Sequence, residues 1–229
     1  MSSPPTDAST LPGDARLGRP ARSAAVRLRA TTLVLGLLAA ALGALALGLL
    51  MVRPSAAPLP VLGVVPEFEL IEASGAKISR ADLGGKLWIA DFVFTSCAAS
   101  CPKMTAEMAR LQKSESDVAD LRLVSFSVDP ETDTPEVLRG YAARHQADPS
   151  RWLFVTGDPA KLRGLAIDGF RIPVGAGDPA QGDAAIIHSD RFVLVDRQAR
   201  IRGYYEASDG DALLKLRGDV RRLEQEPAS

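Results

Sequence analysis

An uncharged apolar run between Thr31 and Val52 divides this chain of 229 residues into a short N-terminal tail and a longer C-terminal part. The run lies between Arg29 and Arg53 and is long enough to cross a bilayer as a helix. Residues 1–29 form a tail rich in Ser, Pro and Ala, whose arginines crowd towards the run. Because positive charge marks the cytoplasmic side of a membrane span, we expect a cytoplasmic tail and a periplasmic remainder.

The sequence therefore predicts a single-pass inner-membrane protein anchored by residues 30–52. A cleavable signal peptide is the alternative, since Ser55, Ala56 and Ala57 are small enough to permit cleavage. Its apolar core would usually hold only about 7 to 15 residues. The longer run favours an anchor that is kept.

Beyond the anchor, residues 53–66 contain four prolines and no helical period, which predicts a semi-rigid spacer. The folded domain is then expected over residues 67–229, a length that suits one compact domain. This part of the chain has more acidic than basic residues and no basic cluster. Nucleic acid is therefore excluded as its expected partner.

Strands and helices are predicted to alternate along the domain. A first strand pair is expected around Phe68 and Ile71, turning at Gly75, and residues 87–94 (LWIADFVF) are typical of a central strand. Further strands are predicted at residues 121–128, 152–155, 192–196 and 201–205. Helices are predicted at residues 103–114, 134–145, 158–165 and 211–223, and a loop at residues 172–183. This order predicts a three-layer α/β fold with a central mixed sheet, preceded by one N-terminal transmembrane helix.

Both cysteines of the chain lie in the segment CAASCP, between the central strand and the helix that follows it. Cys101 precedes Pro102 at the helix start, where free amides and the helix dipole are expected to lower a thiol pKa. Cys97 is expected in the connecting loop. Their three-residue separation is one longer than in the dithiol oxidoreductases with two-residue spacing. Two converging sulfurs would form a disulfide or bind a soft cation such as Cu(I).

A third metal donor has to come from elsewhere, and the chain has only two histidines. His188 is better placed, between the predicted loop and the following strand, whereas His145 ends a helix, where its positive charge is favourable. A structural disulfide and a buried histidine are the alternatives for this set. Asp129 and Asp133 would serve as turn and cap formers. Core packing is the expected role of Met104, Met108, Trp88 and Trp152.

Three motifs, taken in order, resemble those of the Sco/SenC family. They are FTSCAASCPKM at residues 94–104, SVDPETDTP at residues 127–135, and HS at residues 188–189 followed by FVLVD and RGYY. The resemblance covers roughly residues 67–224 and implies a membrane-tethered, thioredoxin-like fold. It departs from the family at Ala98, where proline is common, and at Ala199, where glycine is common in a turn. The first departure is expected to loosen the ligand loop.

The resemblance also implies the site and its cargo. The two cysteines and the histidine that bind metal in the family correspond to Cys97, Cys101 and His188, and the family's aspartate-rich segment corresponds to Asp129 and Asp133, near the metal. It implies a copper metallochaperone rather than an enzyme. Its implied partners are a copper donor protein and the copper-bearing subunit of cytochrome c oxidase.

Two alternatives use the same residues differently. A membrane-tethered thiol:disulfide reductase would keep the cysteines of the oxidase copper site reduced, with Cys97 or Cys101 as the attacking thiolate and a thiol reductant as a partner. His188 would then be its electrostatic or proton-transfer neighbour. A peroxidase of the peroxiredoxin kind is a third alternative.

Overall fold

The computed structural model describes residues 21–51, 57–97, 100–173, 175–176, 186–187 and 189–226. The chain forms two compact units, Met1–Ala57 and Pro58–Ser229. The first unit contains helix α1 (Ala21–Met51), whose side chains at residues 31–46 are all exposed. Over the described ranges, no helix combines the length and the apolar character that crossing a membrane requires.

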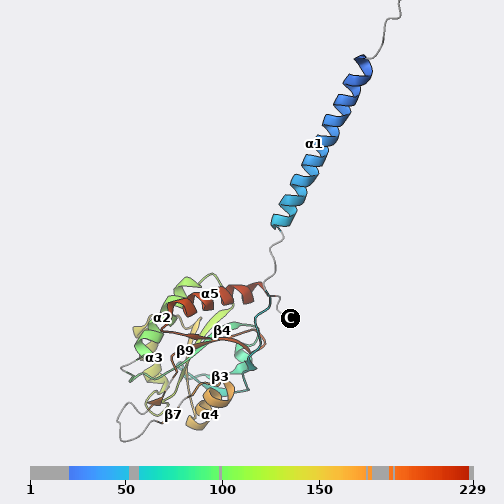
Figure 1. Ribbon diagram of the computed structural model, residues 1–229. Coiled ribbons are helices and arrows are strands. Elements are labelled where there is room, and N and C mark those ends of the chain that lie inside the picture. Colours follow the sequence, from blue (N-terminus) through green and yellow to red (C-terminus); the bar gives the residue numbers. More distant parts are fainter. Residues whose placement is uncertain are drawn as a thin grey trace, which may run out of the picture. The chain divides into compact units, whose positions relative to one another are not determined.

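The second unit is built on an eight-stranded mixed sheet with the order β1-β10-β9-β4-β5-β6-β2-β3 (Figure 1). Its strands are β1 (Gly63–Val64), β2 (Glu69–Glu72), β3 (Lys77–Ser79), β4 (Leu87–Val93), β5 (Leu121–Ser127), β6 (Trp152–Thr156), β9 (Arg191–Val195) and β10 (Arg200–Glu206). Strands β4, β5 and β6 pair in parallel, and the other neighbours pair antiparallel. The short strands β7 (Gly175–Ala176) and β8 (Ile186–Ile187) form a separate antiparallel pair.

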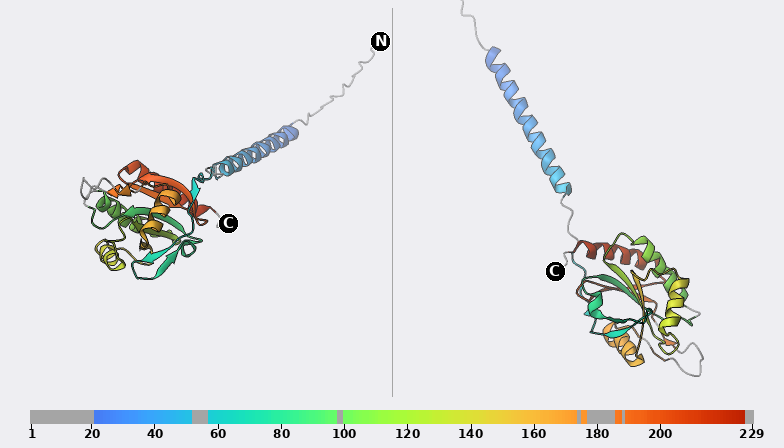
Figure 2. Two further views of the ribbon diagram at one scale, coloured as in Figure 1. Left: turned by 90° about the horizontal axis from the view of Figure 1, so that it is seen from below. Right: turned by 180° about the vertical axis from the view of Figure 1, so that it is seen from behind.

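Helices cover both faces of this sheet. They are α2 (Cys101–Ser114), α3 (Pro135–Arg144), α4 (Pro159–Gly164) and α5 (Gly210–Gln225), with a 3₁₀ turn η1 (Arg80–Leu83) and a π turn η2 (Leu165–Gly169). Helices α2, α3 and α5 lie on one face and α4 lies on the other (Figures 1 and 2). Asp158 caps the start of α4, because its carboxylate accepts a hydrogen bond from the Lys161 amide at 2.9 Å.

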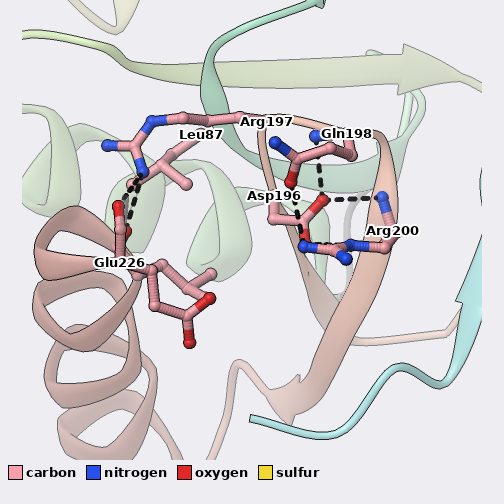
Figure 3. Close-up of a pocket in the computed structure, with 7 residues that line it drawn as sticks. Leu87, Asp196, Arg197, Gln198, Arg200 and Glu226 are labelled. Carbon is pink, nitrogen blue, oxygen red and sulfur yellow. Dashed lines mark hydrogen bonds and ion pairs between the residues drawn. The ribbon is translucent and has the colours of Figure 1, made fainter. Parts of the chain in front are cut away.

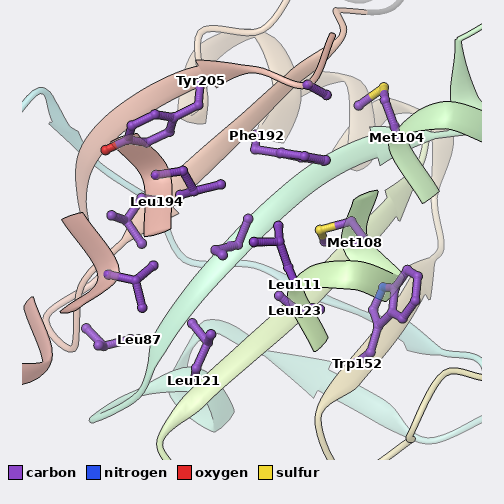
Figure 4. Packing of buried hydrophobic residues seen from close by; sticks show 14 of the residues in the cluster. Leu87, Met104, Met108, Leu111, Leu121, Leu123, Trp152, Phe192, Leu194 and Tyr205 are labelled. Atoms are coloured by element: carbon purple, nitrogen blue, oxygen red, sulfur yellow. The ribbon is translucent and has the colours of Figure 1, made fainter. Parts of the chain in front are cut away.

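The apolar core has two halves because alternate residues of a strand point to opposite faces of a sheet. In β4, Leu87 and Ile89 face the half shared with α2, α3 and α5. Trp88 and Phe92 face the other half, under η2. Figure 4 shows the first half, where side chains of α2 pack against those of the sheet. The predicted core residues are confirmed, each with at most 1% exposure: Met104, Met108, Trp88 and Trp152.

The predicted three-layer α/β architecture is confirmed, and the main helices and strands lie within two residues of their predicted bounds. The boundary of the folded unit differs, since the predicted spacer at residues 53–66 belongs to it from Pro58 onward. Leu59 and Val65 are buried at 7% and 0% exposure. The apolar residues of this proline-rich segment follow no helical period, so its attachment to the domain could not be predicted from the sequence pattern.

Arg202 holds this N-terminal segment against the sheet. Its guanidinium donates to the carbonyl oxygens of Leu59 at 2.6 Å and Pro60 at 3.2 Å, and to the Asp196 carboxylate at 2.8 Å. Asp196 also accepts hydrogen bonds from Arg200 and from the turn amides in a polar pocket beside the start of β4 (Figure 3). The side chain of Arg202 thus joins residues far apart in the sequence.

The turn between β9 and β10 contains one of the family departures. Ala199 has a φ of 57°, in the left-handed region that favours glycine. A side chain in this conformation costs roughly 1 kcal/mol. The left-handed backbone of this turn therefore explains why glycine is common at this position in the family.

Candidate metal centre

The two cysteines lie where β4 ends and α2 begins. Cys101 is the first residue of α2 and has no exposed surface, while Cys97 lies in the preceding loop and is half-buried. Both are in the thiol form. Cys101 packs in a small cluster with Val93 and Phe94, against which Cys97 also rests. Cys97 is therefore the more accessible residue of the two.

Burial raises the pKa of the Cys101 thiol, a backbone hydrogen bond at Phe94 lowers it in part, and the neighbouring Cys97 raises it further. The expectation that the helix start lowers this pKa is wrong for Cys101. Loss of hydration around a completely enclosed sulfur outweighs the favourable helix dipole. In the metal-free state the buried sulfur therefore holds its proton firmly.

Asp133 fixes the loop that leads to Cys97. Its buried carboxylate accepts hydrogen bonds from the Thr95 amide at 3.2 Å, from the Thr95 hydroxyl, and from the Ser127 hydroxyl at 2.7 Å. Burial raises the pKa of Asp133, although these hydrogen bonds oppose the rise. Asp133 thus ties the end of β5 to a residue two positions before Cys97.

Asp129 has a different place from Asp133. It is half-buried, and its backbone carbonyl accepts from the amides of Thr132 and Asp133 at 3.2 and 2.9 Å. Its own amide donates to the Ser127 hydroxyl at 3.1 Å. Asp129 therefore shapes the turn, and it is Asp133 whose side chain reaches the cysteine loop.

Thr95 and Ser127 were not singled out from the sequence, although both lie inside motifs that carry the family resemblance. Only their positions, Thr95 near a candidate ligand and Ser127 near a candidate aspartate, could have indicated a role from the sequence.

His188 lies outside the described residues. Within those residues, no group of three or more His, Cys, Asp or Glu side chains is arranged to hold a metal ion. The geometry therefore brings the two cysteines and Asp133 to one end of β4.

His145 ends α3 as predicted, but its environment is less favourable to charge than a helix end alone implies. Its ring lies 4.6 Å from that of Tyr141, between centroids. Burial lowers the pKa of His145, and the nearby Arg144 lowers it further. Neutral histidine is therefore favoured, contrary to the expected charge at this position.

The chain matches the family model for SCO1/SenC over residues 59–218. It belongs to the SCO1/SenC family. This SCO1/SenC chain is 33% identical over 159 residues to the SCO1 protein homolog of Bacillus subtilis, a match that covers 69% of this chain and 81% of that protein.

Solved structures of Sco proteins have the same fold as this chain. BsSco, described as a member of the Sco family of cytochrome c oxidase assembly proteins with a disulfide switch, is 30% identical with a TM-score of 0.66. That match covers 74% of this chain and 99% of BsSco. ScoI of Bradyrhizobium japonicum, solved with copper bound, is 25% identical with a TM-score of 0.55 and coverages of 68% and 99%. The mixed α/β unit of this chain is thus the thioredoxin-like fold of Sco proteins.

Proposed function

We propose that this chain is a copper metallochaperone for cytochrome c oxidase, which holds a copper ion between Cys97, Cys101 and His188. The observation that carries the proposal is the pair of thiols gathered at the end of β4 in a fold shared with a copper-bound relative. Thiolate and imidazole are good donors for Cu(I). The half-buried Cys97 offers an incoming partner a place to begin stepwise ligand exchange.

The proposal includes the location of the protein. Residues 30–52 would anchor the chain in the inner membrane, with the N-terminus in the cytoplasm and the domain in the periplasm. The uncharged run and the arginines before it support this orientation. The copper-bearing subunit of the oxidase would then be reached from the periplasmic side.

A thiol:disulfide reductase is the second candidate function, and the unequal burial of the cysteines favours it specifically. The accessible Cys97 would attack a partner disulfide, and the buried Cys101 would then resolve the mixed disulfide. The products would be a reduced partner and the Cys97–Cys101 disulfide. Similarity to BsSco, for which a disulfide switch is described, is consistent with this use of the pair.

Titration of Cu(I) into the reduced full-length chain in detergent tests the first function. We expect stoichiometric tight binding by the wild-type protein, its loss in Cys97→Ala and Cys101→Ala, and at least about tenfold weaker binding in His188→Ala. His145→Ala is the matched control and should bind like the wild type. Stoichiometric tight binding by all three ligand variants would refute the site. Weak wild-type binding that is indifferent to His188, with intact dithiol exchange, would favour the reductase.

Asp133→Ala should weaken Cu(I) binding by about tenfold or more, because the loop before Cys97 loses its fixed position. It should also lower the free energy of unfolding by about 2 kcal/mol, since donors on the half-buried Thr95 and the buried Ser127 lose their acceptor. Competition with a chelator and urea titration measure the two effects. Asp129→Ala, which leaves those hydrogen bonds in place, is the control. Equal effects of the two substitutions would contradict a positioning role for Asp133.

A further inference from the structure

Three large apolar side chains lie exposed on one short stretch at the start of the folded unit. Val61, Leu62 and Val64 have exposures of 53%, 38% and 57%. Single exposed apolar residues are ordinary on a protein surface, whereas a contiguous group marks a contact surface. In the rest of the described part of this unit, the exposed large apolar side chains are isolated from one another in the sequence: Val137, Ile167 and Leu214. Residues 61–64 are called the apolar stretch below.

The backbone of the apolar stretch is fixed by the sheet. Strand β1 lies within it and pairs with β10, and the Leu62 amide donates to the Ile201 carbonyl at 2.8 Å. Just before the stretch, Arg202 donates to the carbonyl oxygens of Leu59 and Pro60. The stretch is therefore an ordered part of the fold, and its apolar side chains are exposed at a fixed edge of the sheet.

The sequence keeps the apolar stretch close to the proposed membrane anchor. Val61 follows Val52, the last residue of the uncharged run, by nine residues. Because an extended chain spans at most about 3.6 Å per residue, Val61 stays within about 30 Å of the end of the run. A surface tethered at this distance meets the bilayer at a high effective concentration, so contact with lipid costs little further freedom.

We propose that Val61, Leu62 and Val64 rest in the interfacial layer of the membrane that holds the anchor. This inference deepens the proposed function and rests on its membrane anchoring. The contact removes the three apolar side chains from water. Strand β1 is at the edge of the sheet order, so its outer side has no neighbouring strand among the described residues. Polar lipid headgroups then satisfy the exposed backbone groups of this edge.

The contact also keeps the cysteine loop clear of the lipid. The apolar stretch lies level with the start of β4, because Val195 of β9 pairs with both Ile201 and Trp88. Val93, at the other end of β4, lies roughly 17 Å further along the strand. The cysteine loop follows Val93, so a partner in the aqueous compartment reaches it without displacing the contact.

Tryptophan substitution in vesicles tests the contact. Val61→Trp, Val64→Trp and the control Leu214→Trp are prepared in the full-length chain and reconstituted into phosphatidylcholine–phosphatidylglycerol vesicles, with and without bromine on the acyl chains near the headgroup. Bromine quenches indole fluorescence only at short range. After subtraction of the wild-type signal from the buried Trp88 and Trp152, the first two variants should be quenched at least about twofold. Leu214→Trp, on the exposed side of α5, should not be quenched.

Extraction of the vesicles with alkaline carbonate separates failure of the contact from failure of the anchor. A chain that is washed off the vesicles would overturn both proposals. A retained chain in which Val61→Trp and Val64→Trp are quenched no more than Leu214→Trp would overturn the contact alone. A blue-shifted emission that bromine does not quench, and that is lost when the protein is diluted in lipid, would show contact between two copies of the chain and would also overturn it.

Discussion

Between about pH 4 and pH 8, the stability of Asp91→Asn should improve by about 4 kcal/mol relative to that of the wild-type protein. The reason is the burial of this carboxyl group, which raises its pKa from 3.8 to about 7. Each pH unit between those two values contributes about 1.4 kcal/mol. Urea titration of the reduced, metal-free chain, followed by the fluorescence of the buried Trp88 and Trp152, measures the effect.

The sign follows from where the proton is bound. Between pH 3.8 and about 7 the folded protein keeps a proton on Asp91 that the unfolded chain has lost. Stability is therefore full below the unfolded pKa and is lost as the pH rises through the folded pKa. The raised pKa of Asp133 acts in the same direction, and the lowered pKa of His145 acts in the opposite one. Both contributions cancel in the difference between variant and wild type.

Asp219 supplies the control for this pH dependence. Burial raises its pKa, but hydrogen bonds from Lys215 and Tyr205 outweigh this, so its pKa is lowered overall. Its contribution is present above the unfolded pKa and is lost only as the pH falls through the folded pKa. Asp219→Asn should therefore differ from the wild type by a constant amount above about pH 5. A constant difference for Asp91→Asn would show that Asp91 is ionised throughout.

Most of the architecture could be predicted from the sequence, because the central strands are continuous apolar runs and the helices have a clear hydrophobic period. Residues 87–94 and Met104 with Met108 are confirmed as strand and core for this reason. The same reasoning from apolar runs did not single out Asp91. A single acidic residue inside an apolar run is predicted as part of the strand, and only the structure shows that its carboxyl group is completely buried.

The candidate site was predictable where it depends on local order in the chain. Cys97 and Cys101 follow the strongest strand, and the structure places them at its end. The order of residues along the chain did not predict the burial of Cys101, which raises its pKa although the helix start was expected to lower it. Nor did it predict the hydrogen bond between Asp133 and Thr95, which are 38 residues apart. Spacing therefore predicted where these residues lie better than it predicted their chemistry.

Arg202→Ala should lower the free energy of unfolding by about 3 kcal/mol or more, the loss typical of breaking a buried ion pair. Its guanidinium side chain is 3% exposed and donates to the Asp196 carboxylate and to the Leu59 and Pro60 carbonyls. Removing it leaves the buried Asp196 carboxylate and Leu59 carbonyl, and the partly buried Pro60 carbonyl, short of a donor. Urea titration measures the stability loss, and hydrogen exchange should be faster at the Leu62 amide, which bonds the sheet at 2.8 Å.

Arg200→Ala separates this attachment from ordinary ion pairing. Arg200 also pairs with Asp196, at 2.7 Å, but its side chain is 36% exposed and makes no hydrogen bond to the described part of the N-terminal segment. Its loss should cost about 1 kcal/mol or less and leave exchange at Leu62 unchanged. Equal destabilisation by the two substitutions, with equal exchange at Leu62, would mean that Asp196 needs a cation and that Arg202 does not secure the segment. A larger effect of Arg202 at both readouts would identify one arginine as the residue that joins the start of the domain to its sheet.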